Sequence, residues 1–198
     1  MFSCCKAGGA WARLLLVLMM ATAVWGQTTY YVATNGNDAA DGLSWATAVR
    51  SVEMGVQKAA NAGDVVLIGD GIFSVTSSWI IVSNGITVTS LNGPTNTILD
   101  AGAVNGRRVM WVNHPDARVY GLTLRRGNLS QWVAGPAGLR IDAGVVSNCI
   151  VTANRAYGSL SGGGARVTGG LLTHSLIHNN QAHSTGGHGG GLFVSGGE

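Results

Sequence analysis

Residues 164–182, GARVTGGLLTHSLIHNNQA, repeat the pattern of small, apolar and polar residues found 26 positions earlier in GLRIDAGVVSNCIVTANRA, residues 138–156. The two stretches align without a gap, and the alignment matches Ile141 with Val167. The second copy begins at Gly164 and a third begins at Gly191, so the spacing is nearly constant. Self-similarity at a fixed period of about 20 to 50 residues is typical of repeat architectures.

The length of the repeat selects one architecture. Helical repeats would show a period of 3.6, leucine-rich repeats would show a leucine consensus, and a propeller blade needs about 40 residues. None of these fits the short spacing from Gly138 to Gly164 and from Gly164 to Gly191, in repeats rich in valine, isoleucine, threonine and glycine. Three short strands and three turns do fit, so each repeat is predicted to form one coil of an all-β parallel β-helix.

Stacking explains why the pattern repeats. Leu139 and Ile141 are separated by one residue and therefore point to one side of a strand, while Arg140 between them points to the other. Coils about 4.8 Å apart would place Ile141 over Val167 and Val167 over Val194. Each buried side chain contributes roughly 1.5 to 3 kcal/mol, but only when a neighbouring coil covers it.

Two kinds of residue are expected at the bends. Asn154 and Asn180 occupy equivalent positions, where an asparagine can adopt the left-handed conformation and its amide can bond the neighbouring backbone. A ligand contact is the alternative for this pair. The glycines of GGGARVTGG, residues 162–170, suit turns with positive φ or close approach between coils.

Residues 1–26 are predicted to be an export signal. Lys6 and Arg13 precede the apolar segment 14–24, which is too short to span a bilayer. Cleavage is expected after Gly26, with Ala23 as the alternative, and it leaves ten basic against nine acidic residues and Cys149 as the one thiol. This balance argues against a nucleic-acid partner. Cys149 is expected to be a buried apolar residue.

The remainder divides into a cap, residues 27–63, and coils, residues 64–198. In the cap, a strand and a turn-rich loop precede a helical period over residues 44–64, with the apolar stripe Val49, Val52, Val56, Ala59 and Ala60 and a stop at Gly63. This short helix is expected to cover one end of the coils. Glu198 falls halfway through a coil, which predicts a fragment truncated at its C-terminus.

The segment YYVATNGNDAADGLSWATAVRSVEMGVQKAANAGDVVLIGDGIF, residues 30–73, resembles the opening of secreted right-handed parallel β-helix proteins of the pectin-lyase-like superfamily. The residues that match this opening are Gly36, Asn37, Asp38, Asp41, Gly42, Ser44, Trp45, Ala48, Gly63, Asp64, Val66 and Ile68. The resemblance implies a right-handed helix with an N-terminal strand-helix cap, in a secreted or cell-surface protein. The superfamily includes polysaccharide lyases, glycoside hydrolases and surface adhesins.

The catalytic groups of that superfamily do not transfer. Its pectate lyases use clustered aspartates for calcium and a lysine or arginine base. After Asp64 this chain has only Asp70, Asp100, Asp116, Asp142 and Glu198 as acids, and no lysine. The sequence therefore identifies no catalytic motif.

Two groups of residues are candidate ligand sites for a metal ion. Asn35, Asn37, Asp38 and Asp41 place four oxygen-bearing side chains in one loop, which could collect calcium, or else cap the helix through Asx turns. The histidines cluster near the C-terminus, at His174, His178, His183 and His188, but on elements that do not converge, so they are interpreted as solvated surface side chains.

Outward columns provide the candidate glycan contacts. Arg140 is expected beneath Arg166 and Phe193, and Arg125 beneath Thr152 and His178. Guanidinium groups match carboxylates and an aromatic ring offers a face to a sugar. Together with the resemblance, these columns predict an extracellular polysaccharide or cell-surface glycan as the partner that the protein binds or acts on. A pectate-lyase-like action is what the resemblance implies. The alternative is a non-catalytic surface adhesin or structural passenger of the polymorphic outer-membrane type.

Overall fold

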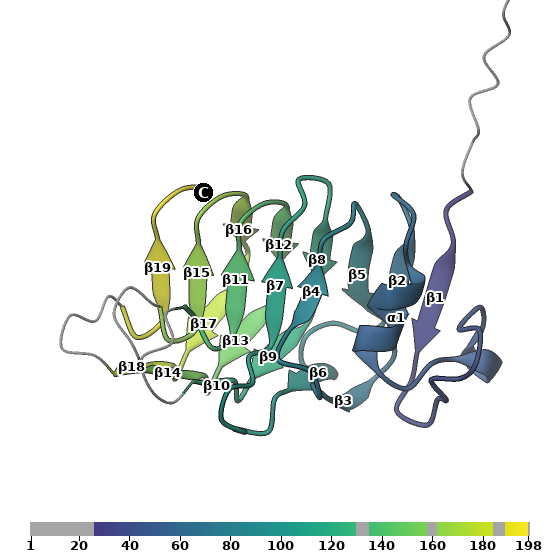
Figure 1. Cartoon of the computed structure of the whole chain (residues 1–198), viewed down its shortest axis with the longest axis horizontal. Coiled ribbons are helices and arrows are strands. Elements are labelled where there is room, and N and C mark those ends of the chain that lie inside the picture. Colours follow the sequence, from purple (N-terminus) through teal and green to yellow (C-terminus); the bar gives the residue numbers. More distant parts are fainter. Residues whose placement is uncertain (1–25, 130–134, 158–161, 184–188, 198) are drawn as a thin grey trace, which may run out of the picture.

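The computed structural model describes residues 26–129, 135–157, 162–183 and 189–197. Short parallel strands wind into a right-handed β-helix, as the repeat predicts (Figure 1). The strands form three long sheets, here called sheets A, B and C, and a narrow sheet D. Successive strands of one sheet come from successive coils, and in the later coils each ladder joins segments one repeat apart.

The strands of each sheet follow in stacking order. Sheet A consists of β1 (Thr29–Val32), β2 (Val65–Ile68), β5 (Thr87–Ser90), β8 (Arg118–Tyr120), β12 (Val145–Ser147) and β16 (Leu171–Thr173). Sheet B consists of β3 (Gly71–Ser74), β6 (Thr97–Asp100), β9 (Thr123–Arg125), β13 (Ile150–Thr152) and β17 (Leu176–His178). Sheet C consists of β4 (Ile80–Val82), β7 (Met110–Val112), β11 (Leu139–Ile141), β15 (Ala165–Val167) and β19 (Leu192–Val194). Sheet D consists of β10 (Asn128–Leu129), β14 (Arg155–Tyr157) and β18 (Gln181–His183).

The core is the column structure that the repeat predicts. Ile141 pairs with Val167, and Val167 pairs with Val194. Leu139 and Ile141 are fully buried, whereas Arg140 between them is partly exposed. In this strand of sheet C the middle residue therefore points outward and its two neighbours point inward. This alternation decides which side chains form the outer face of the sheet.

Cys149 is buried, as expected, and burial raises the pKa of its thiol to about 11. The side chain lies in the same apolar cluster as Ile141 and Val151. It is therefore a packing residue and not a nucleophile.

The predicted helix over residues 44–64 is wrong in extent. The segment contains the 3₁₀ turn η1 (Trp45–Thr47) and the short helix α1 (Val52–Lys58), which ends well before Gly63. Between them Val49 forms a parallel bridge with Val32, because its backbone completes the edge of sheet A. Tertiary pairing here overrides the helical period.

The helix does cover the first coils, since α1 packs against β1, β2 and β4 (Figure 1). Val52 and Ala59 of the predicted apolar stripe are buried, but Ala60 is exposed. Gly55 allows the close approach, because a Cβ atom there would lie 2.7 Å from Val32 Cγ2 and 2.9 Å from Val66 Cγ1.

The paired asparagines form a ladder inside the bend between sheets B and D. Asn154 donates from Nδ2 to Asn180 Oδ1 at 3.0 Å, and its own Oδ1 accepts from the backbone nitrogen of Gly127 at 2.8 Å. The expectation that the amides bond neighbouring backbone is confirmed. The expected left-handed conformation is not found at these two residues. It belongs to the preceding ones, Ala153 at φ 55° and Asn179 at φ 53°.

The predicted export signal lies outside the described residues, apart from Gly26. Within the described ranges, no helix has the length and hydrophobicity needed to cross a bilayer.

Candidate functional site

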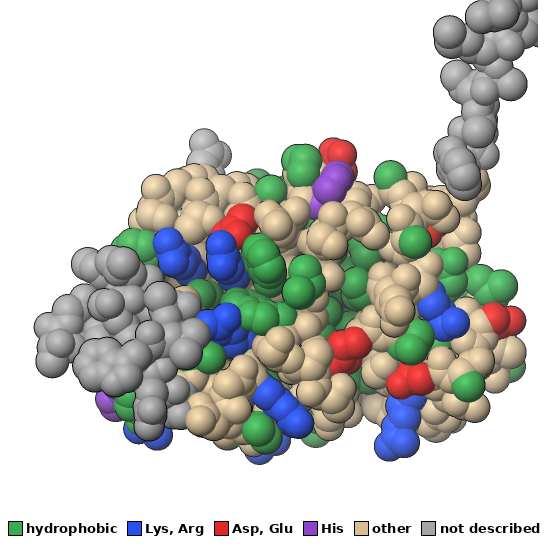
Figure 2. All heavy atoms as spheres, viewed as in Figure 1, with side chains coloured by type: hydrophobic (Ala, Val, Ile, Leu, Met, Phe, Trp, Pro, Cys, Tyr) green, Lys and Arg blue, Asp and Glu red, His purple; other side chains and the backbone are tan. Residues whose placement is uncertain are grey.

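Arginine, aromatic and acidic side chains meet on the outer surface of sheet C. The middle residues of its strands are Ile81, Trp111, Arg140, Arg166 and Phe193, and the strand register stacks them in one column. Four further residues flank this column, namely Trp79, Arg108, Asp142 and Thr168. These nine residues are called the sheet C face. Figure 2 shows basic and hydrophobic side chains gathered over β7, β11 and β15, with an acidic side chain beside them.

Asp142 organises the centre of the sheet C face. Its carboxylate accepts from Arg140 through Nε at 3.0 Å and through Nη2 at 2.7 Å, a two-pronged ion pair. It also accepts from Trp111 Nε1 at 2.9 Å and from the Thr168 hydroxyl. Burial opposes ionisation of Asp142, but the hydrogen bonds from Arg140, Thr168 and Trp111 outweigh it and hold the pKa of the carboxyl below its usual value. Trp111 and Arg140 are thereby held in one orientation.

Arginine and aromatic side chains alternate along the face. The Arg140 guanidinium lies 4.7 Å from the centre of the Trp111 ring, and the Arg108 guanidinium lies 4.6 Å from the centre of Trp79. Trp79 and Trp111 approach each other at 6.3 Å between ring centres. Cation–π contacts of this kind attract a guanidinium group to the face of an aromatic ring, so they hold each arginine against its tryptophan on the outer surface of the sheet.

The face has an excess of positive charge. Arg140 and Arg166 are register partners on adjacent strands, so their backbones lie about 4.8 Å apart. Burial lowers the pKa of the Arg108 guanidinium, and repulsion from Arg140 adds to the effect. Asp142 neutralises Arg140 alone. Arg166 has no ion pair with a described residue, and its Nε is buried without a hydrogen-bond partner there.

The second predicted column is present but lies on another sheet. Arg125 pairs with Thr152 and Thr152 with His178 on sheet B, so this column and the sheet C face are separate surfaces. Arg125 is engaged by Asp100, whose carboxylate it meets at 2.8 Å. Thr152 lies 3.4 Å from His178 through its hydroxyl. The charge of Arg125 in this column is therefore already paired with Asp100.

The four candidate metal ligands of the cap loop lie close together in the sequence. Three of them accept hydrogen bonds from backbone nitrogens through their side-chain oxygens. Asp38 Oδ1 accepts from the nitrogens of Arg50 and Ser51, both at 2.8 Å. Asn37 and Asp41 each accept from the backbone nitrogen two positions further on, which is the geometry of Asx turns. Asn35 is exposed. Calcium binding by this loop stays a prediction.

The histidines do not converge within the described ranges, where no group of three histidine, cysteine or acidic side chains could hold a metal ion. His174 and His178 are exposed. His183 stacks on Tyr157 with 4.8 Å between ring centres. His188 lies outside the described residues.

Sequence reasoning missed part of the sheet C face. Arg140, Arg166 and Phe193 were predicted to stack, but Trp79, Arg108, Trp111 and Asp142 were not assigned to the site. Trp111 pairs with Arg140, which lies more than one repeat further along the chain, because a longer connection separates β10 from β11. The spacing of the later coils therefore does not align Trp111 with Arg140. Aligning the apolar residues Met110 and Val112 with Leu139 and Ile141 would have found this pair.

Taken together, the coils, the cap and this outer face define a right-handed parallel β-helix with a basic, aromatic-lined surface. The fold agrees with the resemblance of residues 30–73 to the pectin-lyase-like superfamily. No family model and no curated protein matches the chain. Among solved structures it is similar to a protein named rhamnogalacturonan lyase, with 16% sequence identity and a TM-score of 0.46. The match covers 86% of this chain and 62% of that protein, so the chain spans less than two thirds of its length.

Proposed function

We propose that the protein binds an acidic extracellular polysaccharide on the sheet C face. The observation that carries the proposal is the stacking of Arg140 and Arg166 on adjacent coils with Asp142 as the one described carboxylate on the face. Asp142 neutralises Arg140, whereas Arg166 has no ion pair with a described residue, so a bound carboxylate can pair with Arg166. Trp79 and Trp111 add flat apolar surfaces of the kind that sugar rings cover.

The proposal is for binding and does not include turnover. The single described carboxylate of the sheet C face accepts from four donor groups on three side chains, so it is not a base poised to take a proton. Lyase chemistry can be tested separately by incubating the protein with calcium and polygalacturonate or alginate. Unsaturated products would absorb in the ultraviolet.

The test of binding compares polysaccharides that differ in charge. We expect the protein to bind polygalacturonate or alginate, and to bind dextran far more weakly, in isothermal titration calorimetry or affinity electrophoresis. Arg166→Ala should weaken binding about tenfold, because a charge-assisted hydrogen bond contributes about 1.5 kcal/mol or more. Arg118→Ala on sheet A is the matched control and should have no such effect. Equal binding by both variants would contradict the proposal.

Arg125→Ala distinguishes the two predicted columns. Since Arg125 is held by Asp100 on sheet B, we expect its replacement to leave polysaccharide binding unchanged. A loss of affinity similar to that of Arg166→Ala would instead assign the polysaccharide to the sheet B column. The surface adhesin or structural passenger remains the alternative, and it would be favoured by an absence of binding to every acidic polysaccharide.

We also propose that the protein acts outside the cell, on the basis of the predicted export signal. Mass spectrometry of the protein recovered from the culture medium or the cell surface should show an N-terminus at Gln27. Retention of residues 1–26 would contradict this part of the proposal.

A further inference from the structure

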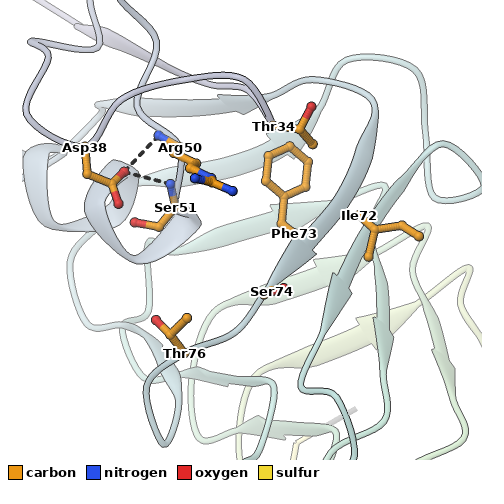
Figure 3. Close-up of a pocket in the computed structure, with 8 residues that line it drawn as sticks. All are labelled: Thr34, Asp38, Arg50, Ser51, Ile72, Phe73, Ser74 and Thr76. Atoms are coloured by element: carbon orange, nitrogen blue, oxygen red, sulfur yellow. Dashed lines mark hydrogen bonds between the residues drawn. The ribbon is translucent and has the colours of Figure 1, made fainter.

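A hollow of about 390 Å³ lies where the cap meets the first coil. Its walls come from the cap loop, the start of α1 and strand β3 of sheet B (Figure 3). The lining residues are Thr34, Asp38, Arg50, Ser51, Ile72, Phe73, Ser74 and Thr76. None of them belongs to the sheet C face. The volume is within the range of pockets that hold small ligands, about 300 to 1,000 Å³.

The walls are held in place by hydrogen bonds that do not involve a ligand. Asp38 ties the loop to α1 through the backbone nitrogens of Arg50 and Ser51. On the other side, Glu53 Oε1 accepts from the backbone nitrogen of Thr76 at 2.8 Å, which ties α1 to the segment after β3. A hollow fixed on both sides loses little entropy when a ligand enters it.

The side chain of Arg50 supplies a positive charge to the hollow, and this charge also attracts the Asp38 carboxylate. Its backbone nitrogen bonds Asp38, but the described residues include no hydrogen bond or ion pair to its guanidinium. Figure 3 shows the side chain extending away from Asp38 towards the Phe73 side of the hollow. A guanidinium in this position presents a planar fork of N–H donors that matches a carboxylate.

The remaining walls suit a hydroxylated ligand. The hydroxyls of Thr34 and Ser74 have no hydrogen-bond partner among the described residues. Asp38 uses Oδ1 for the two backbone nitrogens. Burial opposes ionisation of Asp38, but the hydrogen bonds from Ser51 and Arg50 outweigh it and lower the pKa of the carboxyl, so it is an ionised acceptor at neutral pH. Ile72 is 55% exposed and offers an apolar wall to C–H groups.

We propose that this hollow binds a small polyhydroxylated carboxylate, with the carboxylate on Arg50 and the hydroxyls on Thr34, Ser74 and Asp38. Both ligand features are needed, because one cation alone would accept any anion and the hydroxyl groups alone would accept any sugar. The same chemistry can come from a free hydroxy acid or from the acidic end of a glycan chain. This site is separate from the sheet C face and does not depend on the function proposed for it.

The test uses three probes with the full chain. Gluconate carries both features, glucose has hydroxyls without the charge, and acetate has the charge without hydroxyls. We expect gluconate to bind more tightly than either of the others in calorimetry, and to shift the amide NMR signals of Thr34 and Ser74. A short acidic oligosaccharide that shifts the same signals would identify a chain end as the source, whereas gluconate alone would identify a free acid.

Arg50→Gln is the decisive variant. It removes the charge but keeps the backbone nitrogen that bonds Asp38, so the wall should stay intact. We expect gluconate binding to weaken about tenfold, while Lys58→Gln, a control with the same change of charge on α1, leaves it unchanged. Gluconate that binds no better than glucose and acetate, or that binds Arg50→Gln as well as the parent chain, would overturn the proposal. Arg166→Ala should not affect gluconate, and Arg50→Gln should not affect polygalacturonate, so the two proposals fail independently.

Discussion

Replacing Asn154 with alanine tests the asparagine ladder that joins neighbouring coils. Asn154 is 1% exposed, and its side chain makes three hydrogen bonds, with the nitrogen of Gly127, the carbonyl of Leu124 and the amide of Asn180. Each bond contributes about 1 kcal/mol, and the buried Gly127 N–H left without an acceptor costs a further 1 to 2 kcal/mol or so. We therefore expect Asn154→Ala to lower the free energy of unfolding by about 4 kcal/mol.

The measurement is equilibrium urea unfolding followed by far-ultraviolet circular dichroism. Asn180→Ala should cost less, about 1 to 2 kcal/mol, because Asn180 is only half-buried and water can replace its partners. The matched control is Asn113→Ala, since Asn113 is exposed and its side chain has no hydrogen bond among the described residues. This change should cost less than about 0.5 kcal/mol. If Asn154→Ala and Asn113→Ala unfold at the same urea concentration, the ladder does not stabilise the coils and the argument is wrong.

Three further predictions concern stability and reactivity. Gly144→Ala should lower the free energy of unfolding by about 3 kcal/mol, because Gly144 has φ 86° and the new Cβ atom would lie 2.7 Å from two carbonyl oxygens. Gly106→Ala is the control, since Gly106 has φ 84° but open space around it, and this change should cost about 1 kcal/mol. Urea unfolding measures both values. Cys149 should react with iodoacetamide at pH 8 at least about a hundredfold more slowly in the folded protein than in urea, since burial raises the pKa of its thiol to about 11; equal rates would show that the coil opens. Asp100→Asn should lower the free energy of unfolding by about 2 kcal/mol at neutral pH, a value reduced by the partial exposure of Arg125 and Arg126. The variant should also lose less stability than the parent chain as the pH falls from about 5 to about 2.

The pH dependence at Asp100 follows from the direction of its pKa shift. Burial opposes ionisation of this carboxyl, but hydrogen bonds from Arg126, Gly102 and Arg125 outweigh it and lower the pKa in the folded chain. The unfolded chain binds a proton first, at about pH 3.8, so the stabilisation is present above that pH. It is lost as the pH falls through the lower value of the folded state.

The coil architecture was predictable because it depends on positions within a repeat. Ile141 and Val167 are equivalent in the sequence, and the structure pairs them. The helix was less predictable, because the apolar period of residues 44–64 does not reveal that Val49 bridges to Val32 in another part of the chain. The same holds for the left-handed residues of the bend, where Ala153 and Asn179 differ in type but share a backbone conformation set by the coil.

The candidate site was predictable only in part. The repeat places Arg140 beneath Arg166 and Phe193, because the three follow at regular intervals. It does not place Trp111 beside Arg140, because the connection between their strands is longer than in the later coils.

The sequence by itself determined the period, the buried columns of the core and the stacking of Arg140 and Arg166 on adjacent strands of one outer face, since all three follow from which residues recur at the same point of each coil. Only the tertiary structure decided that Asp142 draws Trp111 and Arg140 together, that Arg125 is already paired with Asp100, and that the cap leaves a hollow beside Arg50. The physical reason is that a side-chain contact depends on which residues meet across coils, around bends and between cap and coil. The number of residues between two contacting side chains varies with the length of each connection. A single repeat length in the sequence therefore does not predict these contacts.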